Sequence, residues 1–498
     1  MGALEILTLA FTHPLEFRIL LQFWNYHEPK RDITRKEEHA TSGWDRPAMR
    51  RCWELLDFTS RSFASVIKEL DGDLARVICL FYVVLRGLDT IEDDMTIPDD
   101  IKQPLLRSFH EKTVTPGWNF DGNGPKEKDR IVLLDYHLVV EELLRLEPNC
   151  RETIVDICHK METGMADFAH RAALSPVPLT LETVEEYDLY CHYVAGLVGE
   201  GLSRLFSATG KESESLSQQL ELSNSVGLLL QKTNIIRDFR EDADDRRFFW
   251  PREIWGSTEY TADGHTPSTD IRELLRDPRR AAWVQSAMVV DALRHACDAL
   301  DYLRLLRNQS IFNFVAIPAT MALATLDLCF MNPQMFERNI KIRKAKAAEL
   351  IMRSTNPREV VNIFKEHARS IHAKASPADP NYLRVSVACA KIEHWAERNY
   401  PSFIRVLPST YGSSPGISFD PSDARSRIAH ADAETDRRAA DEKRLLGIRE
   451  RIAAGGSPST SLTSNQGPPW EVLGVVGGAV FLVLGLSLGI VYLVLYFM

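Results

Sequence analysis

The chain has 498 residues, of which 45% are hydrophobic, so it is long enough to bury a sizeable core in one large domain or several. Its net charge of −10 argues against general nucleic-acid binding and means that an anionic ligand needs local basic side chains or metal ions. Eight scattered cysteines without a C-x-x-C pair exclude a disulfide framework and are typical of reduced thiols in a cytosolic compartment.

The first apolar stretch, residues 4–24, is interrupted by His13, Pro14, Glu16 and Arg18. It lacks the basic n-region, the continuous apolar h-region and the small-residue cleavage site of a signal peptide. We therefore expect no secretory leader here.

Helical periodicity dominates the residues that follow. Between residues 52 and 70, apolar side chains recur at the i, i+3, i+4 spacing of a helix: Cys52, Leu55, Leu56, Phe63, Val66, Ile67 and Leu70. The sequence "DGD" at 71–73 is predicted to turn the chain and cap the next helix. No alternating strand series appears, so the sequence predicts an all-α fold.

An acidic motif ends that next helix. The stretch "LRGLDTIEDDM" at residues 85–95 completes the apolar run "VICLFYVVL", and helical geometry places Asp89, Glu92 and Asp93 on one face. Like charges at this spacing cost about 0.2–0.5 kcal/mol per pair on an exposed helix, so a compensating cation is expected. The alternative is a solvated helix end.

Glycines at residues 196–201, "GLVGEG", have some likeness to a dinucleotide-binding loop. They follow the helical stretch "YDLYCHYVA" rather than a strand, which makes a Rossmann interpretation weak. We interpret these glycines as positions where helices approach closely.

The acidic pattern recurs at residues 238–242, "DFRED", again after a long apolar helix. The polar side chains before and within it step by three or four residues: Gln231, Asn234, Asp238 and Glu241 or Asp242. Two such helix ends facing each other would gather six carboxylates. Mg²⁺ prefers oxygen ligands and commonly bridges carboxylates to substrate phosphates, so the sequence predicts a diphosphate held between two acidic walls. Coincidental surface acidity is the alternative.

The C-terminal part changes composition twice. Residues 411–469 become rich in Gly, Ser and Pro, which is typical of a flexible tether. Residues 472–498 carry no charge and exceed the roughly 20 residues that cross a bilayer, with Trp470, Tyr492 and Tyr496 placed as interfacial anchors. The predicted parts are a helical catalytic domain at 1–410, the tether at 411–469 and a transmembrane anchor at 470–498.

Six stretches together resemble the squalene synthases, which are head-to-head isoprenoid synthases. They are "TSRSFASVI" (59–67), "YVVLRGLDTIEDDM" (82–95), "YCHYVAGLVGEGLSRLFSA" (190–208), "LQKTNIIRDF" (230–239), "FWPREIW" (249–255) and "LRNQSIFNFVAIP" (306–318). The loops at 110–125 and 256–270 and the segment 375–469 carry none of the resemblance. One departure is Phe239-Arg240, where the family often has Tyr-Leu, because it places a cation beside the expected metal ligands.

The resemblance implies an isoprenoid synthase helical bundle with a central cavity and a Mg²⁺- and NADPH-dependent farnesyltransferase activity. Such an enzyme couples two farnesyl diphosphates to presqualene diphosphate and reduces it to squalene, the first committed step of sterol synthesis. The implied Mg²⁺ ligands are Asp89, Glu92, Asp93, Asp238, Glu241 and Asp242. The implied diphosphate contacts are Ser60, Arg61, Arg86 and Arg247.

Tyr190 occupies the family's catalytic tyrosine position, and Tyr82 is a second candidate from the opposite helix. A phenol has a pKa near 10, so it acts as a base only if cations lower that pKa or released diphosphate shares the proton. Phe312 and Phe314 are expected to face carbocations, unless one is core packing. The remaining assignments are Gln231 and Asn234 to substrate, and Lys232 and Asn234 to NADPH.

Two alternatives stay open: phytoene-synthase-like coupling without reduction, and a non-enzymatic membrane-tethered isoprenoid-binding scaffold. The anchor and "NQSIFNFVAIP" disfavour the first, and the two acidic motifs disfavour the second. The expected location is the endoplasmic reticulum membrane, with a single-pass C-terminal anchor. The catalytic body is expected to be cytosolic and monomeric, without a nucleic-acid partner, and the sequon at Asn308 is expected to stay unglycosylated.

Overall fold

The computed structural model describes residues 11–26, 31–60, 62–174, 180–245, 247–261 and 270–401. Arg61, the predicted tether and the predicted anchor therefore lie outside the described residues. Within the described ranges the regular elements are helices, and the single β-bridge pairs Thr180 with Phe248. The all-α prediction is confirmed for this part of the chain.

The helical period of residues 52–70 is carried by α4 (Pro47–Ser60) and α5 (Ser62–Lys68). Gly72 follows with a positive φ of 63°, so the predicted turn is confirmed. Asp73 stands at the N-cap of α6 (Leu74–Asp93), as predicted, although its carboxylate accepts no hydrogen bond from the first turn. The backbone at Asp73 is already helical, which does not favour that bond.

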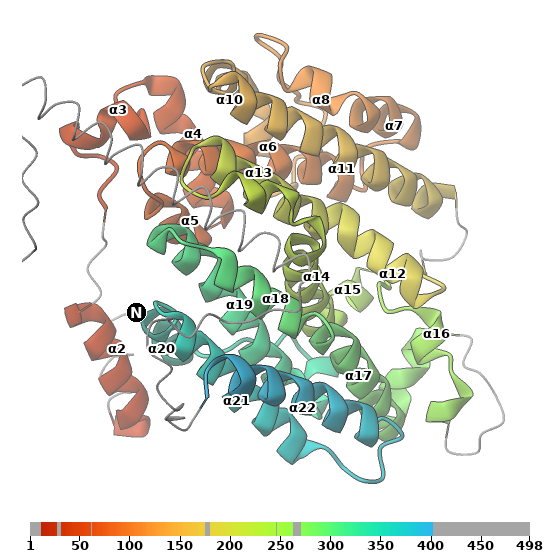
Figure 1. The fold of residues 1–498 in the computed structure, drawn as a ribbon. Helices are drawn as coiled ribbons and strands as arrows, with labels where there is room; N and C mark the ends of the chain where they lie inside the picture. The colour runs from red at the N-terminus through yellow and green to blue at the C-terminus, as the bar shows by residue number, and fades with distance from the viewer. Residues whose placement is uncertain are drawn as a thin grey trace, which may run out of the picture. The chain divides into compact units, whose positions relative to one another are not determined.

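The centre of the bundle is formed by α14 (Leu220–Arg237) and α19 (Gln309–Cys329), which pack against each other (Figure 1). Around α14 lie α13 (Leu197–Ala208), α17 (Pro278–Leu293) and α18 (Ala296–Leu305). Among the described residues, α19 alone has the length and apolarity of a membrane span, yet 72% of its apolar window is buried. Its burial in this bundle makes it a core helix.

A second layer surrounds α6. The long helix α11 (Pro148–Leu174) packs against α6, α7 (Asp99–Arg107), α8 (Phe109–Lys112) and α13. On the other side α6 contacts α4, α9 (Arg130–Leu134) and α10 (Tyr136–Leu144). The shorter elements are α3 (His39–Ser42), α12 (Val184–Cys191), α15 (Phe239–Asp244) and α16 (Arg252–Trp255).

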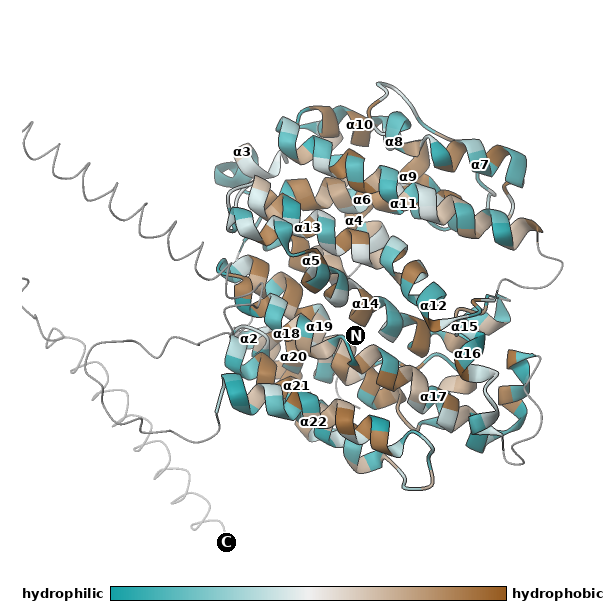
Figure 2. Ribbon diagram, turned by 45° about the vertical axis from the view of Figure 1, so that its right-hand side comes forward, coloured by the Kyte–Doolittle hydropathy of each residue, from teal (hydrophilic) through white to brown (hydrophobic). Residues whose placement is uncertain are grey.

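The last helices form an amphipathic outer layer. They are α20 (Lys344–Arg353), α21 (Pro357–Lys374) and α22 (Tyr382–Asn399), and hydrophilic and hydrophobic residues alternate along α21 and α22 (Figure 2). Helix α2 (Pro14–Tyr26) packs on α20.

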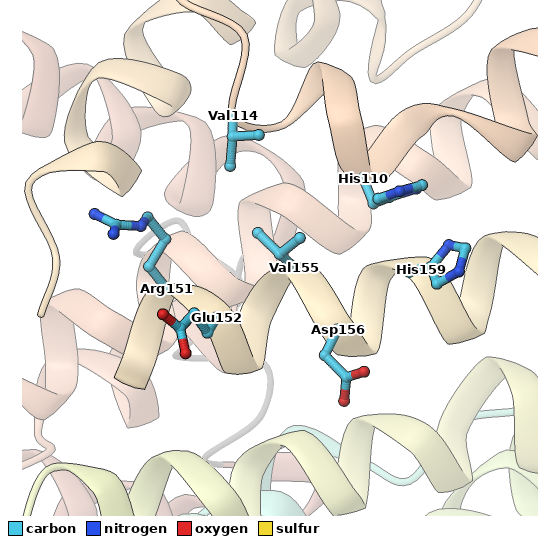
Figure 3. Close-up of a pocket in the computed structure, with 7 residues that line it drawn as sticks. All are labelled: His110, Val114, Arg151, Glu152, Val155, Asp156 and His159. Atoms are coloured by element: carbon cyan, nitrogen blue, oxygen red, sulfur yellow. The ribbon is translucent and has the colours of Figure 1, made fainter. Parts of the chain in front are cut away.

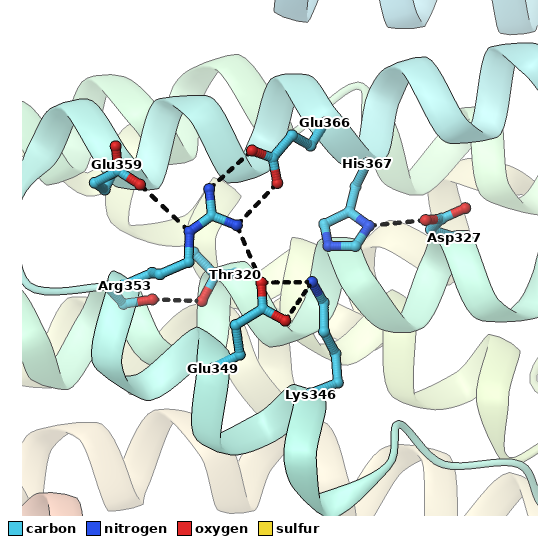
Figure 4. Close-up of polar contacts among 9 residues, drawn as sticks. Thr320, Asp327, Lys346, Glu349, Arg353, Glu359, Glu366 and His367 are labelled. Carbon is cyan, nitrogen blue, oxygen red and sulfur yellow. Dashed lines mark hydrogen bonds and ion pairs between the residues drawn. The ribbon is translucent and has the colours of Figure 1, made fainter. Parts of the chain in front are cut away.

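Arg353 ties α20 to α21. It donates to Glu349 at 3.2 Å, to Glu359 at 3.3 Å and to Glu366 at 2.8 Å (Figure 4). The bond to Glu366 is the first cause of the raised pKa of Arg353, so the cation is held firmly between the two helices.

The glycines of residues 196–201 lie where helices touch. A π-helical turn, His192–Gly196, joins α12 to α13, and a Cβ added at Gly199 would overlap the backbone of Ser223 on α14. The contact is reciprocal, because a Cβ at Gly227 would lie 2.5 Å from the carbonyl oxygen of Ala195. The interpretation of these glycines as close-approach positions is confirmed.

Candidate functional site

The first acidic wall is the C-terminal part of α6. The run from Val77 to Leu85 is buried except for Tyr82, which begins the more accessible face that continues through Arg86 and Asp89. Arg86 Nη2 donates to the Tyr82 hydroxyl at 3.0 Å, and Arg86 Nη1 lies 3.6 Å from the Asp89 carboxylate. The apolar period of α6 therefore turns these three side chains to one side of the helix.

The second acidic wall is formed where α14 ends and α15 begins. Asp238 stands between the two helices and accepts hydrogen bonds from Arg237 at 2.6 and 2.8 Å. Asn339 donates to Asp238 at 3.0 Å and to Glu241 at 2.5 Å. An amide from a distant segment thus holds two carboxylates of the motif in one place.

Arg247 connects the two walls. Its Nη1 donates to Asp93 of the first motif at 3.0 Å, and its Nη2 donates to Asp242 of the second motif at 3.4 Å. The guanidinium also contacts Asp245, while its Nε is buried without a hydrogen-bond partner. One guanidinium spans only a few ångströms, so Asp93 and Asp242, one carboxylate from each motif, lie close together.

Burial and mutual repulsion change the acidity of the gathered carboxyl groups. Burial raises the pKa of Asp89 to about 6 against the attraction of Arg86, and burial raises the pKa of Asp242 to about 7 against the attraction of Arg247. The pKa of Glu92 is also raised, by burial first and then by the charges of Asp93 and Asp89. The raised pKa values show that the nearby arginines do not fully offset burial and repulsion, and carboxylate oxygens are the donors that Mg²⁺ prefers.

Tyr190 lies beside the acidic walls, between the rings of Phe168 and Phe249, which together are called its aromatic clasp. Its ring stacks on Phe249 at 4.9 Å and 18°, and Phe168 approaches its edge at 5.1 Å. Burial holds the pKa of Tyr190 well above its ordinary value, and the charges of Glu92 and Asp93 add to that effect while Arg247 opposes it. The phenol is therefore protonated in the free protein, and a role as base requires either bound cations that lower its pKa or released diphosphate that shares the proton.

Ser60, Phe312 and Phe314 lie in the neighbouring part of the bundle. Ser60 ends α4, and its hydroxyl is buried without a hydrogen-bond partner among the described residues. Both phenylalanines are buried on α19, and the Phe314 ring lies 5.2 Å from that of Phe63. Arg61 follows Ser60 but lies outside the described residues.

Gln231 and Asn234 precede Asp238 on α14 at helical spacing, so they lie on the same face as that carboxylate. Lys232 does not join them. Its ammonium is fully buried and donates to Asp188 and Asp291, each at 2.5 Å. The prediction that Lys232 meets an NADPH phosphate does not fit this geometry, because two carboxylates already neutralise it.

Several contacts near the walls escaped the sequence analysis. They come from Lys102, which donates to the backbone carbonyl of Glu92 at 2.8 Å, from Asp129 near Arg86, and from Asn339. None belongs to an acidic motif, and no local pattern marks them. Arg240, the departure from the family pattern, donates to Asp244 at 3.1 Å rather than to an expected metal ligand.

Comparison with known proteins agrees with this geometry. Residues 56–346 match the family model described as squalene/phytoene synthase. The squalene synthase of Ganoderma lucidum is 61% identical over 473 residues, which cover 94% of this chain and 100% of that protein. That of Mycosarcoma maydis is 50% identical over 414 residues, which cover 81% of this chain and 72% of that protein.

Among solved structures, one described as "The complex structure of TcSQS with ligand, E5700" is 38% identical, with a TM-score of 0.65. The match covers 70% of this chain and 98% of that chain. The helical bundle with its two facing acidic motifs defines an isoprenoid synthase, which is a class of enzymes. The chain belongs to the squalene/phytoene synthase family, and the predicted resemblance to squalene synthases is confirmed.

Proposed function

We propose that this enzyme joins two farnesyl diphosphates head to head into presqualene diphosphate and then reduces that intermediate with NADPH to squalene. The observation that carries the proposal is the Arg247 guanidinium, which contacts Asp93 of one acidic motif and Asp242 of the other. Two facing sets of carboxylates suit a diphosphate that is bound through Mg²⁺. The high identity to squalene synthases supports the choice of substrate and product.

The residues that would hold Mg²⁺ are Asp89, Glu92, Asp93, Asp238, Glu241 and Asp242. When bound, the metal would neutralise the diphosphate and stabilise the negative charge that develops on the leaving group. Arg86 and Arg247 would offer planar guanidinium groups to the diphosphate oxygens. The Ser60 hydroxyl, which has no partner in the part of the chain that the structure describes, would donate to them. Arg61 is proposed for the same role from the sequence.

Loss of diphosphate leaves an allylic cation, which the protein must shelter from water. Phe168 and Phe249 clasp Tyr190 and present aromatic rings beside the walls, and aromatic faces attract positive charge by about 0.5–2 kcal/mol. Tyr190 is proposed to accept the proton that coupling releases and to share it with the released diphosphate, with Tyr82 as the second candidate. Phe312 and Phe314 would complete the apolar lining.

Gln231 and Asn234 share a helical face with Asp238, and we propose that these two side chains orient substrate. Asn234 is also proposed to orient the nicotinamide of NADPH. NADPH supplies the hydride when bound. The catalytic body at 1–410 is proposed to be a cytosolic monomer with a central cavity. The tether at 411–469 would connect it to a single span at 470–498 in the endoplasmic reticulum membrane.

The test is product analysis of the full-length protein in detergent. It is incubated with farnesyl diphosphate and Mg²⁺, with and without NADPH, and the lipids are identified by mass spectrometry. We expect presqualene diphosphate without NADPH, squalene with NADPH, and neither product after chelation of the metal. A phytoene-type hydrocarbon that forms regardless of NADPH would overturn the reductive step, and binding without turnover would favour the scaffold.

A further inference from the structure

Two histidines and a glutamate meet between α8 and α11, outside the two acidic walls. Glu162 Oε1 lies 2.5 Å from His110 Nδ1 and 2.9 Å from His159 Nδ1. Glu162 Oε2 accepts the backbone N–H of His110 at 2.7 Å. The two imidazole rings lie 4.1 Å apart. Both rings therefore converge on one carboxylate oxygen.

The charge of this cluster is not balanced by a permanent cation. The Glu162 side chain is 0% exposed, and within the described part of the chain its ion-pair partners are these two imidazoles. Burying a carboxylate is costly unless a positive charge accompanies it. Neutral imidazoles supply hydrogen bonds but no charge. A divalent cation in place of the two ring protons would neutralise the carboxylate and keep all three side chains together.

The cluster also borders open space. His110 and His159 line a cavity of about 350 Å³ together with Val114, Arg151, Glu152, Val155 and Asp156. Figure 3 shows the two histidines side by side at one end of this row of side chains, His110 from α8 and His159 from α11. The cavity is large enough to admit a water molecule next to the imidazoles.

We propose that His110, His159 and Glu162 form a zinc site. One ligand atom from each residue lies within 4.8 Å of the other two, which suits a single ion with metal–ligand distances of about 2.0–2.2 Å. Two imidazoles and one carboxylate form a set that binds Zn²⁺ with a water in the fourth position, whereas Mg²⁺ prefers oxygen ligands alone.

The geometry also assigns a role to the ion. Helix α8 has four residues, too few to be stable alone, while His159 and Glu162 stand three apart on one face of the 27-residue α11. A zinc ion would fasten the short helix to the long one. The site is independent of the proposed synthase reaction, because no residue of either acidic wall takes part.

The test is zinc binding by the full-length protein, prepared without a histidine tag, in detergent. The protein is stripped with a chelator and returned to excess Mg²⁺ so that the acidic walls are occupied. Zn²⁺ is then titrated by calorimetry, and bound metal is counted by mass spectrometry. Co²⁺ serves as a second probe, because a four-coordinate nitrogen and oxygen site gives visible absorption. We expect about one zinc per chain and a higher melting temperature with zinc.

His159→Gln is the decisive variant, since His159 is more than half exposed and its loss leaves the packing intact. We expect zinc affinity to fall at least tenfold and the cobalt absorption to disappear. His170→Gln is the matched control, because His170 also lies on α11 and pairs with Asp99 outside the cluster. Absence of zinc binding by the unmodified protein in excess Mg²⁺ would overturn the proposal, and so would equal affinity in the His159→Gln and His170→Gln proteins.

Discussion

Arg247 is the residue that turns two separate acidic motifs into one site. Its guanidinium lies 3.0 Å from Asp93 and 3.4 Å from Asp242. These two carboxylates are 149 residues apart in the sequence, from position 93 to position 242. It supplies positive charge where burial and repulsion have raised carboxyl pKa values. The site is thereby partly neutralised before any ligand binds.

Asp89→Asn and Asp238→Asn should each abolish coupling while the fold is retained. Each change removes one charged oxygen ligand that no neighbour replaces, and loss of one electrostatic contact to a transition state costs about 100-fold or more in rate. Squalene formation and the melting temperature should be measured together. Asp244→Asn is the matched control, since Asp244 pairs with Arg240 on the same acidic segment. Activity near the unmodified level in either variant would contradict the two-wall arrangement.

Tyr190→Phe should keep the aromatic clasp and lose the proton acceptor. We expect turnover to fall by about 10²–10⁴, the usual contribution of a general acid or base, with an unchanged melting temperature. Tyr187→Phe on the same helix is the control, because the buried hydroxyl of Tyr187 has no hydrogen-bond partner within the described ranges. Equal rates in the two variants would remove Tyr190 from the proton transfer.

Among the elements, α11 depends on a glycine where it meets the π-helical turn. A Cβ added at Gly164 would overlap Cγ, Cδ1 and Cδ2 of Tyr193, so this ring would have to shift to make room. Gly164→Ala should therefore destabilise the protein by about 1–3 kcal/mol despite the better helix propensity of alanine. Denaturant unfolding checks this value. Thr163→Ala, one exposed position earlier, should change stability little, and equal stability of both variants would refute the packing argument.

An ion pair joins Arg46, the residue before α4, to the buried Glu142 of α10. Arg46 donates from Nε to Glu142 Oε1 at 2.9 Å and from Nη2 to Oε2 at 2.6 Å, and Glu142 is 1% exposed. Arg46→Met should destabilise the protein by about 1–3 kcal/mol, because it removes the hydrogen bonds that a buried carboxylate accepts and leaves it with the more distant Arg145, whose Nε lies 3.8 Å from Glu142 Oε1. The double change Arg46→Met with Glu142→Leu should recover most of that loss. If Arg46→Met alone has the same free energy of unfolding as the double variant, Glu142 does not need Arg46 as a partner.

Helix could be predicted from the sequence where apolar residues recur at helical spacing, as they do between Cys52 and Leu70. The acidic walls could be predicted because their residues are local motifs at the ends of those helices. The contacts of Asn339 and Lys102 could not, since they depend on how distant segments pack. The ion pairs of Lys232 could not be predicted, because helical spacing alone does not show that its ammonium is buried against the carboxylates of Asp188 and Asp291.

At the scale of the whole molecule, the proposed anchor supplies location rather than chemistry. The residues proposed for the reaction all lie between Ser60 and Phe314, well before residue 470. Deletion of 470–498 should therefore release a soluble enzyme with near-normal turnover. Centrifugation followed by product analysis checks this. A deletion variant that stays in the membrane fraction, or a soluble one without activity, would contradict the proposed arrangement.

Asn308 should carry no glycan in sealed microsomes, and added protease should digest the body. The structure gives a second reason besides topology: Asn308 Oδ1 accepts from Ser310 N–H at 2.8 Å at the start of α19, and Asn308 Nδ2 donates to Asp71 at 3.0 Å. A glycan on that amide would disrupt this contact. A glycosylated or protease-protected body would overturn the proposed cytosolic location.

The π-helical turn His192–Gly196 sets the rotational phase between Tyr190 and α13. A wider turn accommodates an extra residue, and each residue of a helix advances the side-chain direction by roughly 100°. The part of the chain before the turn can therefore point Tyr190 at its aromatic clasp while the part after it points Gly199 at α14. Deletion of one residue from this turn would remove no side chain of the site, yet it would rotate the Tyr190 phenol away from Phe168 and Phe249. The number of residues in the turn therefore matters as much as which residues they are.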